Sequence, residues 1–118
     1  MTTLELLQGA RAAKPVLARA GGGEKNQALY AMADALVAHT DAILAANRED
    51  LNAARGHISQ VMLDRLALSE ARIADMAEGI RQVAALPDPV GKILRRVERP
   101  AGLVIDKVAV PMGVVAII

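Results

Sequence analysis

The stretch VPMGVVAII, residues Val110 to Ile118, places a proline and a glycine ahead of an unbroken apolar run. A strand that is apolar on both faces is typical of a parallel sheet that helices cover on both sides. We therefore expect Val114–Ile118 to be the first strand of such a sheet. We do not expect the rest of the sequence to supply the neighbours that would shelter it, and an unpaired apolar edge is prone to aggregation. We accordingly expect the chain to be part of a longer protein.

Residues 1–90 show the 3.6-residue periodicity of amphipathic helices. Thr2 and Glu5 have the spacing of an N-terminal capping box. Pro15 predicts a kink or a restart, and the glycines Gly21–Gly23 predict the end of that first element. The next helix carries an apolar stripe made of Leu29, Met32, Ala33, Leu36, Val37, Ile43 and Leu44. This stripe predicts one continuous face packed against other helices.

Short polar residues and a glycine predict where the later helices begin and end. Thr40 or Asp41 can cap the helix after the stripe, and Gly56 is expected to end it in a left-handed conformation. Ser59 and Ser69 are expected to cap two further helices. Their inward side chains are predicted to be Val61, Met62, Leu63 and Leu66 in the first helix, and Ile73, Met76, Ala77, Ile80 and Val83 in the second. Pro87–Pro89 ends the helical region.

From residue 91 the pattern becomes that of strands rich in valine and isoleucine. The RPAG sequence of Arg99–Gly102 supplies a turn between two extended arms, Lys92–Arg99 and Leu103–Val110. The sequence thus predicts three parts. These are a helical region over residues 1–90, a β-hairpin over residues 91–110, and the beginning of the covered parallel sheet over residues 111–118.

The composition excludes several classes of function. The 118 residues carry 14 Lys and Arg against 13 Asp and Glu, a net charge of +1. Phe and Trp are absent and Tyr30 is the sole aromatic residue, so we expect neither nucleic acid nor a membrane as partner. Cysteine is absent, and His39 and His57 stand far apart without further ligands at a suitable spacing. We therefore expect no metal site and no thiol nucleophile in this chain.

Four segments carry a resemblance to a known family: EKNQALYAMADAL, ANREDLNAAR, VMLDRLALSEARIADMAEGIRQVAALPDPVG and RPAGLVIDKVAVPMGVVAII. In this order they resemble the N-terminal part of the gamma-glutamyl phosphate reductases, also called glutamate-5-semialdehyde dehydrogenases, of the aldehyde dehydrogenase superfamily. MLDRLALSEARI followed by PDPVG is specific to this family, whereas PMGVVAII is common across the superfamily. Pro15 and the glycine triplet depart from the family pattern in a peripheral region.

The resemblance implies an α/β fold, aldehyde dehydrogenase-like in the full enzyme, and a cytoplasmic step of proline biosynthesis. In that step L-glutamate 5-phosphate is reduced with NADPH to L-glutamate 5-semialdehyde, and phosphate is released. The family uses a cysteine thiolate that attacks the acyl phosphate, and the thioester then accepts a hydride from the nicotinamide. Because this chain has no cysteine, no catalytic residue is expected in it, and the chain alone is expected to be inactive.

The resemblance also assigns roles to the strand region. Residues 111–118 would begin the dinucleotide-binding domain, with Ile118 as the single candidate cofactor contact, although plain core packing is the stronger interpretation of that residue. The hairpin would be an oligomerisation arm that makes a homo-oligomer through its edges. Gly113 and Pro111 are read as features of a strand boundary.

Two groups of charged residues invite a functional interpretation. Asp64 and Arg65 resemble a carboxylate-binding pair, but a structural salt bridge or cap explains them better. Arg95, Arg96 and Arg99 form a basic patch on the hairpin, for which a solvated or intersubunit strand face is favoured over phosphate binding.

Two other functions stay open. The chain could be a non-catalytic helical interaction module, since it contains no catalytic constellation, or a fragment of a general aldehyde dehydrogenase. The apolar stretch Val114–Ile118, for which we expect no sheltering neighbours in this chain, argues against the first alternative. The segment MLDRLALSEARI argues against the second.

Overall fold

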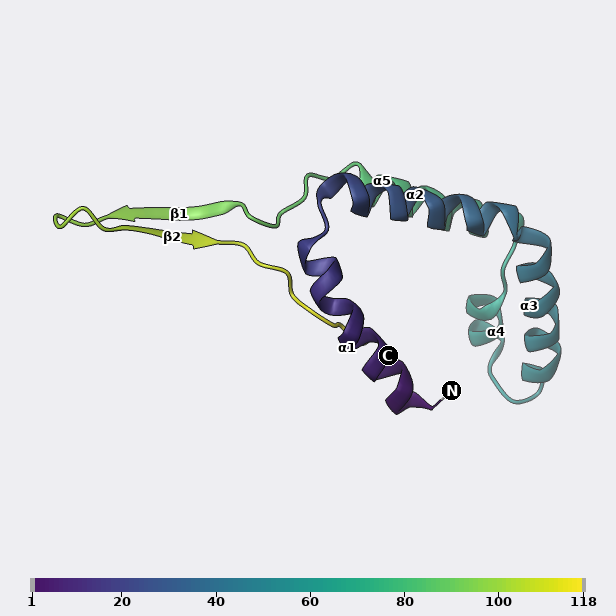
Figure 1. Ribbon diagram of the computed structural model, residues 1–118. Helices are drawn as coiled ribbons and strands as arrows, with labels where there is room; N and C mark the ends of the chain where they lie inside the picture. Colours follow the sequence, from purple (N-terminus) through teal and green to yellow (C-terminus); the bar gives the residue numbers. More distant parts are fainter. Residues whose placement is uncertain (1, 118) are drawn as a thin grey trace. The chain divides into compact units, whose positions relative to one another are not determined.

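The computed structural model describes residues 2–117 as five α-helices followed by two β-strands (Figure 1). The helices are α1 (Thr3–Arg19), α2 (Gly22–Ala38), α3 (Thr40–Ala54), α4 (Gln60–Leu66) and α5 (Glu70–Ala84), and the strands are β1 (Ile93–Glu98) and β2 (Val104–Val108). The predicted order of helices and then a β-hairpin is confirmed. Residues 23–86 form one compact helical unit, and the residues before and after them form a second unit.

Helix α1 begins at the predicted capping box. The Thr2 hydroxyl accepts a hydrogen bond from the Glu5 backbone N–H at 3.2 Å, and the Glu5 carboxylate accepts one from the Thr2 backbone N–H at 2.6 Å. Of the kink or restart expected at Pro15, the restart does not occur, because α1 continues through this residue to Arg19. The helix ends before the glycine triplet, and α2 already begins at Gly22. The cost of an interior proline, about 3 kcal/mol, is therefore borne within one continuous helix.

Of the four caps predicted for helices α3 to α5, three are confirmed. Ser59 and Ser69 accept hydrogen bonds from backbone N–H groups of α4 and α5, at 3.4 and 3.2 Å. Gly56 follows the C-cap of α3 with φ +81°, the left-handed conformation that glycine adopts without strain. The prediction for Thr40 or Asp41 is wrong. His39 occupies the N-cap of α3, and the Thr40 hydroxyl donates back to the Val37 carbonyl at 2.8 Å.

The core of the helical unit is thin. Its buried apolar residues among those described are Ala33, Ile73, Ala77 and Ala84. Several residues predicted to face inward are exposed instead, namely Met32, Val37, Val61, Met62, Met76 and Val83. An ion pair at 2.8 Å between Arg81 of α5 and Asp34 of α2 joins two of the helices at their polar surface. Small alanine side chains permit close helix packing but bury little apolar area, so polar contacts must help define the unit.

One such polar contact is made by Asn47, the buried polar residue of α3, which is only 7% exposed. Its side-chain Nδ2 donates to the Leu66 carbonyl at 2.9 Å, and its Oδ1 accepts from the Leu68 N–H at 2.8 Å. The amide thus holds both the end of α4 and the segment that leads into α5. We call this pair of bonds the Asn47 clasp.

Arg72 holds the same segment from α5. Its guanidinium donates to the carbonyls of Asp64 (2.6 Å) and Ala67, and it lies 3.5 Å from the Asp64 carboxylate. The last carbonyls of a helix have no partner within the helix. Asn47 and Arg72 together satisfy three of these carbonyls at the end of α4, and this fixes where α4 stops and α5 starts.

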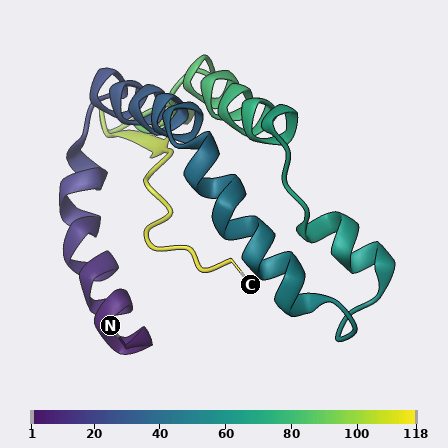
Figure 2. The same ribbon diagram turned by 90° about the vertical axis from the view of Figure 1, so that its right-hand side faces the viewer.

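The predicted third strand is absent from the part of residues 114–118 that the structure describes. Residues 109–117 run as an irregular segment, seen in yellow beyond the arrow of β2 (Figure 2). Val115 is 61% and Ile117 94% exposed. A strand forms only where a neighbour satisfies its backbone groups, and the sheet among the described residues contains β1 and β2 alone.

Within residues 2–117 no helix taken singly has the length and hydropathy of a membrane span; α2 and α3 reach that threshold only as a pair bent by 66°.

We predict that Asn47→Ala lowers the free energy of unfolding by roughly 2 kcal/mol, because a partly buried carbonyl and a partly buried N–H lose their partner. Urea unfolding followed by the helical circular dichroism signal measures the change. Asn52→Ala is the matched control, since Asn52 is exposed on the same helix. An equal effect of the two substitutions would show that the clasp contributes nothing.

Candidate functional site

The β-hairpin lies outside the helical unit. The Gly102 N–H donates to the Arg99 carbonyl and the Arg99 N–H to the Leu103 carbonyl, both at 2.9 Å. Gly102 has φ +79°, which explains why a glycine closes the predicted turn. The strands then pair antiparallel, with Val97 opposite Ile105 and Arg96 opposite Asp106. A register shift between Ile93 and Arg95 leaves one extra residue in β1, as in a β-bulge.

Alternation along the strands gives the hairpin two chemically different faces. On one face Arg96 binds Asp106 through two parallel hydrogen bonds of 2.7 Å, from Nε to Oδ1 and from Nη2 to Oδ2. This fork lowers the pKa of the Asp106 carboxyl and raises that of the Arg96 guanidinium. Glu98 lies on the same face by alternation. Both carboxylates of the hairpin therefore share a face with Arg96.

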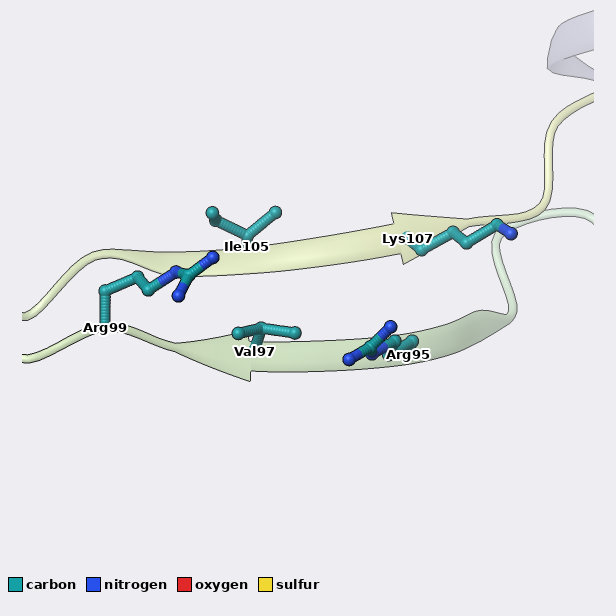
Figure 3. A pocket seen from close by; sticks show the side chains of 5 residues that line it. All are labelled: Arg95, Val97, Arg99, Ile105 and Lys107. Atoms are coloured by element: carbon teal, nitrogen blue, oxygen red, sulfur yellow. The ribbon is translucent and has the colours of Figure 1, made fainter.

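The opposite face holds the cations. Its residues are Arg95, Val97, Arg99, Ile105 and Lys107, which line an open hollow of about 390 Å³ and are hereafter the basic face (Figure 3). Val97 and Ile105 form an apolar centre, and the three cationic side chains surround it. None of the three makes an ion pair with the described residues. The basic face can therefore bind an anionic group next to an apolar one.

This arrangement corrects the predicted basic patch. Arg95 and Arg99 do lie on one face, but Arg96 lies on the other and is neutralised by Asp106. Lys107, which the sequence reasoning did not include, takes the place of Arg96. Adjacent residues of a strand point to opposite faces, so a run of arginines cannot form a single patch.

Asp64 and Arg65 do not form a pair. Asp64 instead lies 3.5 Å from Arg72, an ion pair of the kind that the structural interpretation expects. A second open hollow of about 380 Å³ lies beside it, lined by Leu51, Arg55, Gln60, Leu63, Asp64 and Ala67. Its charged side chains are exposed, so it offers a ligand little shelter from water.

No group of three or more potential metal ligands occurs within residues 2–117. His39 is engaged locally, with its ring Nδ1 2.8 Å from the Ala35 carbonyl oxygen. The proposed cofactor contact, Ile118, lies outside the described residues. Close to it in sequence, Gly113 has φ +99°, and a side chain there would meet the Lys14 side chain at 3.4 Å. The backbone conformation thus favours glycine at this position, while its role at a strand boundary stays a prediction.

The sequence reasoning missed Asn47 and Lys107. The signal for Lys107 was its offset of two residues from Ile105, which any hairpin with a turn at Arg99–Gly102 places on the same face. For Asn47 no local signal exists, since its partners Leu66 and Leu68 are 19 and 21 residues away.

Comparison with known proteins confirms the resemblance read from the sequence. The chain is 55% identical over 116 residues to the gamma-glutamyl phosphate reductase of Neisseria meningitidis, and 54% identical over 114 residues to that of Streptococcus pneumoniae. These matches cover 98% and 97% of the chain but only 28% and 27% of the relatives. The chain therefore spans just over a quarter of their length. No family model matches the chain.

A solved structure supports the same relationship. The crystal structure of gamma-glutamyl phosphate reductase from Thermotoga maritima matches 92% of the chain with a TM-score of 0.87 and 38% sequence identity. The match covers 26% of that protein. The five helices and the two-stranded sheet correspond to its N-terminal part, which confirms the predicted helical region and β-hairpin.

We predict that Asp106 titrates below the usual range of an aspartate and that Arg96→Gln returns its pKa to that range. Because the folded-state pKa is depressed, the stabilising effect of the fork is present at neutral pH and is lost as the pH falls through that lowered pKa. NMR titration of the Asp106 carboxyl carbon measures this directly. Titration of Asp106 in the ordinary range with Arg96 intact would contradict the fork.

Proposed function

We propose that the chain is the N-terminal part of an enzyme that reduces L-glutamate 5-phosphate with NADPH to L-glutamate 5-semialdehyde and phosphate, in the cytoplasmic synthesis of proline. The observation that carries this proposal is the 55% identity to a gamma-glutamyl phosphate reductase over 116 of 118 residues. Similarity at this level over a whole helical and hairpin region supports a common function of the complete proteins. In this proposal the complete enzyme has the aldehyde dehydrogenase-like fold.

The role of these residues is structural rather than chemical. The family's reaction needs a cysteine thiolate to form the thioester, and the sequence contains no cysteine. We therefore expect the chain by itself to bind and orient no reacting group. Its helical unit would instead support the parts of the enzyme that do.

The described residues do not fit a nicotinamide cofactor. Dinucleotides bind at the carboxyl ends of strands in a helix-covered parallel sheet. Val114 to Ile117 have no strand partner among the described residues, and their side chains are exposed. A contact between Ile118 and the nicotinamide belongs to the proposal for the complete enzyme, as does the start of the dinucleotide-binding domain at residue 111.

The hairpin is proposed to be an oligomerisation arm. A two-stranded sheet is marginally stable in water, and each of its strands has an outer edge with no strand partner within residues 2–117. An added strand from another chain would satisfy those backbone groups. The partners implied are thus a second copy of the chain and the small-molecule substrate, with no nucleic acid and no membrane.

The proposal is tested by a chimera. The chain is joined to the remaining three-quarters of the Neisseria meningitidis enzyme, at the point where the match ends. We expect the chimera to reduce NADP⁺ in the presence of glutamate 5-semialdehyde and phosphate, the reverse of the proposed reaction. The chain alone is expected to show no activity above background, because the thiol is missing.

A chimera carrying Asn47→Ala is the structural control. It should be less stable than the unmodified chimera, while its turnover per folded molecule should stay the same. A chimera that is folded and monodisperse by light scattering, yet inactive while the intact Neisseria enzyme is active, would refute the proposed function.

A further inference from the structure

The proposed function does not account for two features of the sequence, the glycines Gly21–Gly23 and the segment PDPVG, residues 87–91. The glycines lead from α1 into α2, which begins at Gly22. The first N–H groups of any helix have no carbonyl partner within the helix. In α1, α4 and α5 a Thr or Ser side chain accepts from such a group. Glycine has no side chain, so the run before α2 offers no cap of this kind.

A carboxylate of PDPVG lies beside this helix start. The Cβ and the Oδ2 of Asp88 are each 3.7 Å from the point that a Cβ on Gly22 would occupy. The other carboxylate oxygen, Oδ1, accepts a hydrogen bond from the Val90 N–H at 3.0 Å. Gly22 and Asp88 belong to the same compact unit, although they are far apart in the sequence. One oxygen of Asp88 is thus engaged within PDPVG, while the other lies near the first residue of α2.

We propose that Asp88 is the N-terminal cap of α2 and that it takes the place of the side-chain cap which the glycine run lacks. Aspartate is among the residues most favoured at helix N-termini, because its oxygens accept from the N–H groups there. Its negative charge also suits the positive end of the helix dipole. The N–H groups in question are those of the first turn, residues 22–24.

The backbone of PDPVG holds the carboxylate in a defined direction. The prolines Pro87 and Pro89 have fixed φ angles, and Pro89 also restricts Asp88 before it to extended backbone. The Pro89 carbonyl accepts from the Lys92 N–H at 3.2 Å, where the hairpin starts. A cap at Asp88 therefore ties the junction of α1 and α2 to the base of the hairpin. This tie accounts for the grouping of the first residues of the chain with the hairpin in one compact unit.

Amide hydrogen exchange tests the cap, followed by NMR in the 118-residue chain. Asp88→Ala should speed exchange of the amides of residues 22–24 about tenfold, the size expected of a lost N-cap, and leave the amides of α5 unchanged. Asp75→Ala is the matched control, because Asp75 is an exposed aspartate of α5. It should leave the exchange of residues 22–24 unchanged.

A local cap supplied at Gly21 should restore the protection. Gly21→Ser gives the spacing of a capping box with Glu24, as at the start of α1. In the Asp88→Ala background it should return the exchange of residues 22–24 to the unmodified rate. The Val90 amide, which loses its acceptor when Asp88 is replaced, should stay fast. This difference separates the cap from the hydrogen bond within PDPVG.

Gly21→Ser alone keeps the test valid if Asp88→Ala disturbs folding. With Asp88 in place the first turn of α2 is already capped, so Gly21→Ser should slow the exchange of residues 22–24 by less than about twofold. The same variants of the chimera, followed by mass spectrometry, extend the measurement to the complete enzyme.

The capping proposal is overturned if Asp88→Ala leaves residues 22–24 unchanged, or if Gly21→Ser alone slows their exchange about tenfold. It is also overturned if Lys25→Met has the same effect as Asp88→Ala, because the carboxylate would then act as an ion-pair partner and not as a cap. None of these outcomes depends on turnover, so the chimera assay decides the enzymatic proposal independently.

Discussion

The arrangement of the helical unit depends on how the backbone between α4 and α5 is satisfied. A seven-residue helix ends there, and its last carbonyls would be costly to leave unpaired near the core. The Asn47 clasp and Arg72 supply partners from α3 and α5, so three helices are fixed at one short segment. Since the buried side chains are mostly alanines, this polar constraint defines the geometry more sharply than apolar packing could.

In the hairpin, the strand register decides which charged side chains have an ion-pair partner. It places those with a partner on one face and cations without a partner among the described residues on the other. The fork of Arg96 and Asp106 completes one face within the chain itself. The other face gathers Arg95, Arg99 and Lys107 with no carboxylate to balance them. An exposed face with both uncompensated charge and an apolar centre gains by being covered. Turn geometry at Gly102 sets the register, and the register in turn decides which cations remain available.

Local signals in the sequence predicted most of the fold. The capping box at Thr2 and the caps at Ser59 and Ser69 are interactions within four residues, so their residue types identify them. The Asn47 clasp and the basic face were not predicted, because they depend on residues that folding brings together. The predicted strand Val114–Ile118 is not formed over residues 114–117, since strand propensity forms a strand only where a neighbour is present.

The net charge of the whole chain likewise does not show which charges folding brings together. A value of +1 suggests a surface without electrostatic preference. This total combines a net charge of −3 on the helical unit, residues 23–86, with a net charge of +3 on the hairpin, residues 92–108. It also does not show that both acids of the hairpin lie on one face. Because exposed charges act only over about 8 Å in physiological salt, a partner senses the local face and not the total. Charge counted by structural face, after register is known, is therefore the quantity that bears on association.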